Sequence, residues 1–105
     1  MGMFDALRGR RRSGGVRRPD PRSSAYLVSW AQAHRGVEAY VEPRTTVTET
    51  TVVLVAHDGE WTRRRITENG ARDLGKKLSI PVYDVGKVGY PQRMRDYTAR
   101  LPKTN

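Results

Sequence analysis

The chain has 105 residues, enough for one domain and too few for two, and 20 Lys and Arg against 11 Asp and Glu give a formal charge of +9. The absence of cysteine excludes a disulfide scaffold, a thiol catalyst and cysteine-bound metal sites. No apolar run reaches the ~20 residues of a membrane span, and none follows the basic N-terminus as a secretory signal would, so we expect a cytoplasmic protein with no membrane partner.

The first 22 residues carry +5 of the total charge. Seven arginines lie here among Gly, Ser and Pro residues: Arg8, Arg10, Arg11, Arg12, Arg17, Arg18 and Arg22. Because the segment has little apolar surface to offset the entropy lost on ordering, residues 1–22 are predicted to be a disordered basic arm, followed by a single domain over residues 23–105. Three interpretations of this arm are open. It binds nucleic acid through the phosphates, it is a solvated tail without a partner, or it contacts an acidic protein or a membrane surface.

A helix is predicted next, over residues 24–35. Tyr26, Leu27 and Trp30 share one apolar face, and Gly36 favours a left-handed stop. His34 falls in the last turn, where the helix dipole favours a cationic group. This position favours a structural role for His34 over a catalytic one.

Three strands are predicted over residues 37–42, 45–56 and 60–66. The second is apolar at both parities from Val52 to Ala56, which indicates a central strand covered on both faces. Asp58-Gly59 predicts a two-residue hairpin turn that places Ala56 opposite Trp61. Because the connections are short, we expect an antiparallel meander.

A second helix is predicted over residues 68–78, with Thr67 as its cap, then a short strand at residues 82–85 and a last helix that begins at Pro91. The chain is therefore predicted to be an α+β protein of order α-β-β-β-α-β-α, with a three-stranded antiparallel meander plus a short fourth strand. The helix between the third and fourth strands favours a parallel, right-handed crossover.

Trp61, Arg63 and Arg65 share one face of the third predicted strand. An aromatic ring between arginines is typical of a nucleic-acid surface, because guanidinium groups bind phosphates and the ring stacks on a base. The alternative is that Trp61 belongs to the core and that the arginines lay their stems along it with their charged ends in water.

Residues 83–97 are the densest polar segment. They combine Lys87, Arg93 and Arg95 with three tyrosines and two glycines ahead of a helix N-terminus, which makes a candidate site for a phosphate or a carboxylate. The alternative is a packed C-terminal helix whose tyrosines are core residues.

Enzyme motifs are absent from the sequence, which has no P-loop and no G-x-G-x-x-G fingerprint. The order of elements matches that of restriction-endonuclease-like nucleases, but Asp58 and Glu60 are only two positions apart and no E-x-K triplet follows. We therefore lean against an enzyme and expect no catalytic residue, no metal site and no cofactor.

Four stretches, VEAYVEPRTTVT (37–48), DGEWTRRR (58–65), IPVYDV (80–85) and GYPQRMR (89–95), resemble a family of small actinobacterial proteins with no established activity. The resemblance covers residues 24–100. Some members carry a general oxidoreductase label, which no cysteine pair, nucleotide fingerprint or haem-ligand pattern supports here. The resemblance implies an actinobacterial source and a cytoplasmic location, and no catalytic residue.

The leading hypothesis is a non-catalytic protein that binds DNA, RNA or a ribonucleoprotein surface through phosphate contacts. The expected contact residues are Arg8, Arg10, Arg11, Arg12, Arg17, Arg18, Trp61, Arg63, Arg65, Lys87, Arg93 and Arg95. The alternatives are a protein-interaction module that docks an acidic partner through residues 83–97 and, third, a small nuclease-like enzyme.

Overall fold

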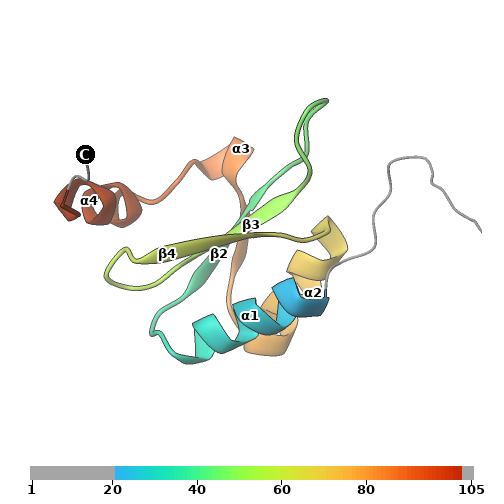
Figure 1. The fold of residues 1–105 in the computed structure, drawn as a ribbon, viewed down its shortest axis with the longest axis horizontal. Helices are drawn as coiled ribbons and strands as arrows, with labels where there is room; N and C mark the ends of the chain where they lie inside the picture. Colours follow the sequence, from blue (N-terminus) through green and yellow to red (C-terminus); the bar gives the residue numbers. More distant parts are fainter. Residues whose placement is uncertain (1–20, 103–105) are drawn as a thin grey trace, which may run out of the picture.

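A four-stranded mixed sheet with helices on both sides forms residues 21–102, which are the residues described by the computed structural model (Figure 1). In chain order the elements are α1 (Pro21–Gln32), β2 (Glu38–Glu42), β3 (Thr51–Val55), β4 (Trp61–Arg65), α2 (Glu68–Leu78), β5 (Val82–Asp84), α3 (Val85–Val88) and α4 (Gln92–Arg100). The predicted disordered arm lies outside the described residues, apart from the first two residues of α1.

The α+β class is confirmed, and β2, β3 and β4 form the antiparallel meander that the short connections predicted. The sheet as a whole is not a pure antiparallel meander. Its strand order is β4-β3-β2-β5, and β5 pairs in parallel with β2, with Ala39 opposite Val82. Helix α2 thus carries the chain from one edge of the sheet to the other, which gives the parallel direction that a helical connection favours.

The pairing of β3 with β4 differs by one residue from the prediction. Trp61 lies opposite Val55, where a two-residue turn had placed it opposite Ala56. The loop has three residues, 57–59, in which the Gly59 N–H donates to the Ala56 carbonyl at 2.9 Å and Gly59 has a φ of +96°. A loop of this type adds one residue between the strands, so every pair is shifted and Trp61 lies on the opposite sheet face from the one expected.

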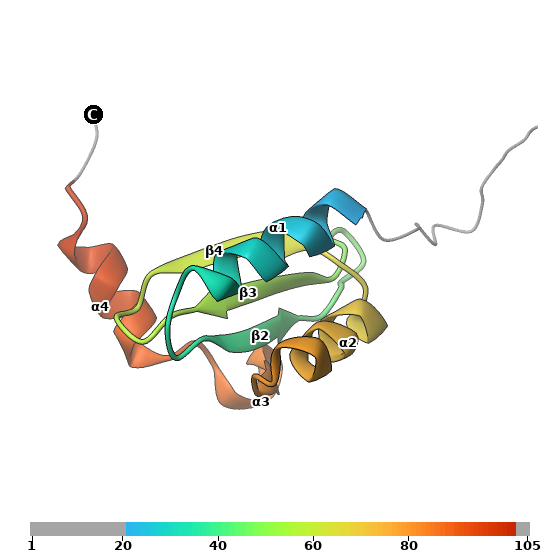
Figure 2. The same cartoon turned by 90° about the horizontal axis from the view of Figure 1, so that it is seen from below.

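The larger core lies between the sheet and the two helices α1 and α2, which Figure 2 shows in front of the strands. Its buried residues are Leu27, Val37, Ala39, Val41, Val52, Leu54, Ala56, Ile66, Ala71 and Leu74. A smaller core on the other face holds Tyr40, Val53, Val55 and Met94, with Trp61, Val85 and Tyr90 packed against it. Because residues 52–55 have no exposed surface, the prediction of a central strand covered on both faces is confirmed.

Local sequence explains the helix ends. Helix α2 spans the predicted residues, and the Thr67 hydroxyl accepts a hydrogen bond from the Gly70 N–H at 3.0 Å. Helix α1 begins and ends three residues earlier than predicted. It begins at Pro21 because proline is tolerated in the first turn of a helix. It ends at Gln32 because the chain then turns more tightly, with the His34 N–H bonded to the Ala31 carbonyl three residues earlier. The one-turn helix α3, which the predicted order lacks, is capped by the Asp84 carboxylate. Within residues 21–102, every helix is too short or too polar to cross a membrane.

Candidate nucleic-acid interface

Trp61 and Arg63, two of the predicted contact residues, are engaged within the fold. The Trp61 indole N–H donates to the Thr98 hydroxyl at 3.0 Å, and its ring packs against the smaller core. The Arg63 guanidinium lies 5.1 Å from the centre of that ring and donates two hydrogen bonds to Glu42, at 2.7 and 2.9 Å. These bonds occupy the indole N–H of Trp61 and two of the three guanidinium nitrogens of Arg63, whose side chain is 43% exposed.

Glu42 is the centre of a polar group that we name the Glu42 cluster, formed by Glu42, Thr51, Arg63 and Tyr90. Besides the two bonds from Arg63, Glu42 accepts the Thr51 hydroxyl at 2.6 Å and the Tyr90 hydroxyl. Burial raises the pKa of Glu42, but the bonds from Arg63, Thr51 and Tyr90 outweigh it and hold the pKa below its usual value. The hydrogen bond to Glu42 and burial both raise the pKa of Tyr90. The Glu42 cluster joins the segment that leads into α4 to the sheet.

Residues 83–97 bring only part of their predicted charge to the surface. Arg93 is half-buried, and it donates to the Ala56 carbonyl at 2.9 Å and to the Glu38 carboxylate at 2.8 Å. These bonds hold α4 against the end of β3. Lys87 and Arg95 are exposed, and Arg95 donates to the Tyr90 carbonyl at 3.0 Å. The structure therefore separates these three cations, which the sequence had placed in one site.

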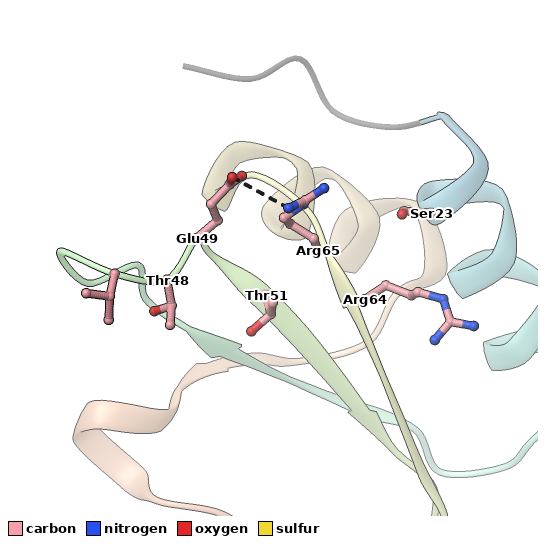
Figure 3. A pocket seen from close by; sticks show the side chains of 7 residues that line it. Ser23, Thr48, Glu49, Thr51, Arg64 and Arg65 are labelled. Carbon is pink, nitrogen blue, oxygen red and sulfur yellow. Dashed lines mark ion pairs between the residues drawn. The ribbon is translucent and has the colours of Figure 1, made fainter. Parts of the chain in front are cut away.

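A groove of about 570 Å³ lies at the C-terminal end of β4 (Figure 3). We name it the β4 groove, and it is lined by Ser23, Val47, Thr48, Glu49, Thr51, Arg64 and Arg65. These residues come from α1, from the connection between β2 and β3, and from the two strands β3 and β4. Sequence reasoning included only Arg65 among them, because Arg64 was assigned to the other strand face and the edge position of β4 was unknown.

Arg64 and Arg65 lie on opposite faces of β4, which is an edge strand of the sheet. The Arg64 guanidinium lies 3.8 Å from the centre of the Tyr26 ring, and Arg65 forms an ion pair with Glu49 at 3.5 Å. Both members of that pair are exposed, at 57% for Arg65 and 40% for Glu49, and an exposed pair contributes only about 0–1 kcal/mol. An incoming anion could therefore replace Glu49 at little cost. Charged side chains on an edge strand also oppose edge-to-edge association, which is a structural role for the same residues.

The β4 groove lies close to the point where the basic N-terminal segment joins the fold. Ser23, which lines the groove, is in the first turn of α1. Arg8, Arg10, Arg11, Arg12, Arg17 and Arg18 lie outside the described residues, so their predicted contacts stay predictions. The segment that carries them precedes α1 in the chain.

The carboxylates considered for a nuclease have other partners in the β3–β4 hairpin. The Asp58 carboxylate accepts the Glu60 N–H at 3.0 Å, and Glu60 pairs with His34 at 3.2 Å. Among residues 21–102 no group of three or more His, Asp or Glu side chains is placed to hold a metal ion. Asp58 and Glu60 thus shape the turn and join it to the end of α1.

His34 is expected to make stability depend on pH. Its Nδ1 donates to the Trp30 carbonyl at 2.6 Å and its ring stacks on Trp30 at 3.7 Å. Burial lowers the pKa of His34, but the bonds to Trp30 and Glu60 outweigh it and raise the pKa above 6.5. Because the pKa of His34 is higher in the folded protein than in the unfolded chain, protonated His34 stabilises the fold. This stabilisation is fully present below pH 6.5 and is lost as the pH rises through the folded-state pKa.

Urea unfolding of the protein and of His34→Phe, measured between about pH 5.5 and pH 8.5, tests this expectation. The midpoint of the unmodified protein should fall across that range by more than the midpoint of the variant, which keeps an aromatic ring on Trp30. Parallel pH profiles for the two proteins would contradict a role for His34.

Neither a family model nor a curated protein nor a solved structure matches the chain, so the resemblance to the actinobacterial family stays a prediction.

Proposed function

We propose that the protein is a non-catalytic nucleic-acid-binding protein that holds phosphates at the β4 groove and along the arginine-rich segment before α1. The observation that carries the proposal is the placement of Arg64 and Arg65 on an open edge strand, beside the turn of α1 where the basic segment enters. Seven arginines of the chain precede residue 23, and two more line the groove.

The chemistry of the lining residues supports a phosphate ligand. A guanidinium group presents a planar fork of N–H donors that matches two oxygens of one phosphate. Ser23, which also lines the groove, carries a hydroxyl group that is a further donor for a phosphate oxygen. Each phosphate that an arginine neutralises releases condensed counterions, so the affinity should depend steeply on salt.

The proposed contact set is narrower than the set expected from the sequence. Trp61, Arg63 and Arg93 are omitted because none of them lines the β4 groove and each bonds to a partner elsewhere in the fold. Arg64 also donates to the Arg63 carbonyl at 2.8 Å, but it lines the groove. Lys87 is omitted because α3 follows β5, at the opposite edge of the sheet from β4. A module that docks an acidic protein through residues 83–97 stays a prediction, with Lys87 and Arg95 as its exposed cations.

Removing the two groove charges tests the proposal. Arg64→Gln/Arg65→Gln keeps part of the aliphatic stem over Tyr26 and should weaken binding to a short duplex by about tenfold, with a salt slope lower by about two. Fluorescence anisotropy between about 50 and 200 mM salt measures both quantities. The matched control is Lys76→Gln/Lys77→Gln, which removes the same charge from the exposed last turn of α2 and should change the affinity by less than about threefold.

A full-length variant tests the basic segment in the same assay. Replacing Arg8, Arg10, Arg11, Arg12, Arg17 and Arg18 by glutamine should lower the salt slope by up to about five and weaken binding more than the groove variant does. Equal effects of the groove pair and the Lys76/Lys77 control would remove the β4 groove from the proposal. Failure of the unmodified protein to bind duplex or single-stranded nucleic acid at about 50 mM salt would overturn it.

A further inference from the structure

The two aromatic residues that contact arginines of β4, Tyr26 and Trp61, are occupied on a ring face and at their polar atoms. Tyr26 packs against the larger core, carries the Arg64 guanidinium 3.8 Å from its ring centre, and shares a 2.8 Å hydrogen bond with Thr62. Trp61 lies between the smaller core and Arg63, and its N–H is bonded. Neither ring is free to stack on a base.

The other aromatic residues of the described chain each contact one further side chain, through a ring face or a hydroxyl group. The Trp30 ring stacks on His34, and the rings of Tyr40 and Tyr83 contact each other with their centres 5.3 Å apart. The Tyr90 hydroxyl bonds to Glu42, and the Arg100 guanidinium lies 5.8 Å from the ring centre of Tyr97. Together with Tyr26 and Trp61, these are the seven Tyr and Trp residues of the chain, and Phe4 lies outside the described residues. Tyr83 is 37% exposed, but it lies on β5, the edge strand opposite β4.

We infer that the preferred ligand is double-helical nucleic acid, bound through its phosphates and without preference for base sequence. The inference rests on the proposed function and adds the class of ligand. Proteins that hold single strands gain about 1–3 kcal/mol for each base stacked on an aromatic ring, and residues 21–102 offer no free ring beside the groove for that contact. Binding to a single strand would therefore depend on charge alone.

Charge alone favours the duplex. The logarithm of the binding constant falls with the logarithm of the salt concentration, with a slope of about 0.9 per neutralised phosphate for a duplex and about 0.7 for a single strand. The slope is larger for the duplex because the duplex has the higher charge density and releases more counterions. The groove offers guanidinium groups from both faces of one edge strand, and Arg22 in the first turn of α1 adds positive charge at the same end. Donors of this kind bind phosphates and carry no base recognition.

A competition assay with the full-length protein tests the inference. A labelled duplex DNA is bound at about 50 mM salt and displaced by unlabelled competitors that contain equal numbers of phosphates. The competitors are duplex DNA of two unrelated sequences, duplex RNA, and a single strand that cannot fold on itself. We expect the two duplex DNAs to compete equally and the single strand to compete at least about tenfold less well. If duplex DNA and duplex RNA compete to different extents, the stronger competitor is the preferred duplex. If they compete equally, the phosphates that both contain are enough for binding.

The outcomes separate the inference from the proposed function. Equal or stronger competition by the single strand would overturn the inference and leave phosphate binding intact, whereas no binding to the labelled duplex would overturn both. The variants Tyr83→Leu and Tyr97→Leu provide a second measurement. They should leave single-strand competition unchanged, and a loss of several-fold in either variant would show that a ring stacks on bases.

Discussion

Gly59→Ala is expected to lower the free energy of unfolding by about 3–5 kcal/mol. Gly59 has a φ of +96°, a conformation that a residue with a side chain rarely adopts. An added Cβ would also lie 2.0 Å from the Arg93 carbonyl oxygen and 2.9 Å from the Cβ of Tyr97. The hairpin and α4 would have to move apart, which would also disturb the bond between Trp61 and Thr98.

Gly89→Ala is the matched control for this prediction. Gly89 also has a positive φ, +73°, but an added Cβ there has no neighbour within 4 Å. Because its ψ of -176° puts it in a region essentially limited to glycine, we expect a loss of about 1–3 kcal/mol, which reflects backbone conformation without the clash. Urea unfolding followed by tryptophan fluorescence measures both variants. Equal losses in the two variants would contradict the close approach of the β3–β4 hairpin to α4.

The second large effect is expected at the Glu42 cluster. Glu42→Gln should lower the free energy of unfolding at neutral pH by about 2–3 kcal/mol, because the amide cannot accept all the hydrogen bonds that Arg63, Thr51 and Tyr90 donate. The Glu42 side chain is only 17% exposed, so water replaces the lost bonds poorly. The expected consequence is a looser attachment of the segment between β5 and α4.

The same variant should flatten the acid part of the stability profile. The pKa of Glu42 is held below its usual value of 4.5 in the folded protein. A lowered folded-state pKa gives a contribution that is present above pH 4.5 and is lost as the pH falls through the folded-state value. The unmodified protein should therefore lose stability on acidification more steeply than Glu42→Gln does.

Glu49→Gln is the control for the Glu42 cluster, because Glu49 also pairs with an arginine of β4. That pair is exposed on both sides, so the expected loss is below about 1 kcal/mol. Thermal and urea unfolding of both variants at neutral and acid pH give the comparison. Similar losses for the two glutamates would show that burial of Glu42 adds nothing to the strength of its pair.

Several elements could be predicted from the sequence because they depend on neighbouring residues. The alternation of residues 37–42, the apolar run of β3 and the capping residue Thr67 each identified its strand or helix, since side-chain period and capping act within a few positions. The turn at Asp58-Gly59 was also located correctly. Its length was not, and the resulting shift of one residue changed the sheet face on which Trp61 lies.

The candidate site illustrates what only the tertiary structure decided. Arg63 and Arg65 are two positions apart on one strand face and are indistinguishable by pattern, yet Arg63 pairs with the largely buried Glu42 and Arg65 with the exposed Glu49. Arg93 similarly finds the carbonyl of Ala56, 37 positions earlier in the chain. Composition and periodicity thus determined the charge, the α+β class and most of the elements. Strand register, the pairing of β5 with β2, and the choice of arginines that stay at the surface depend on contacts between distant residues, and these exist only once the chain has packed.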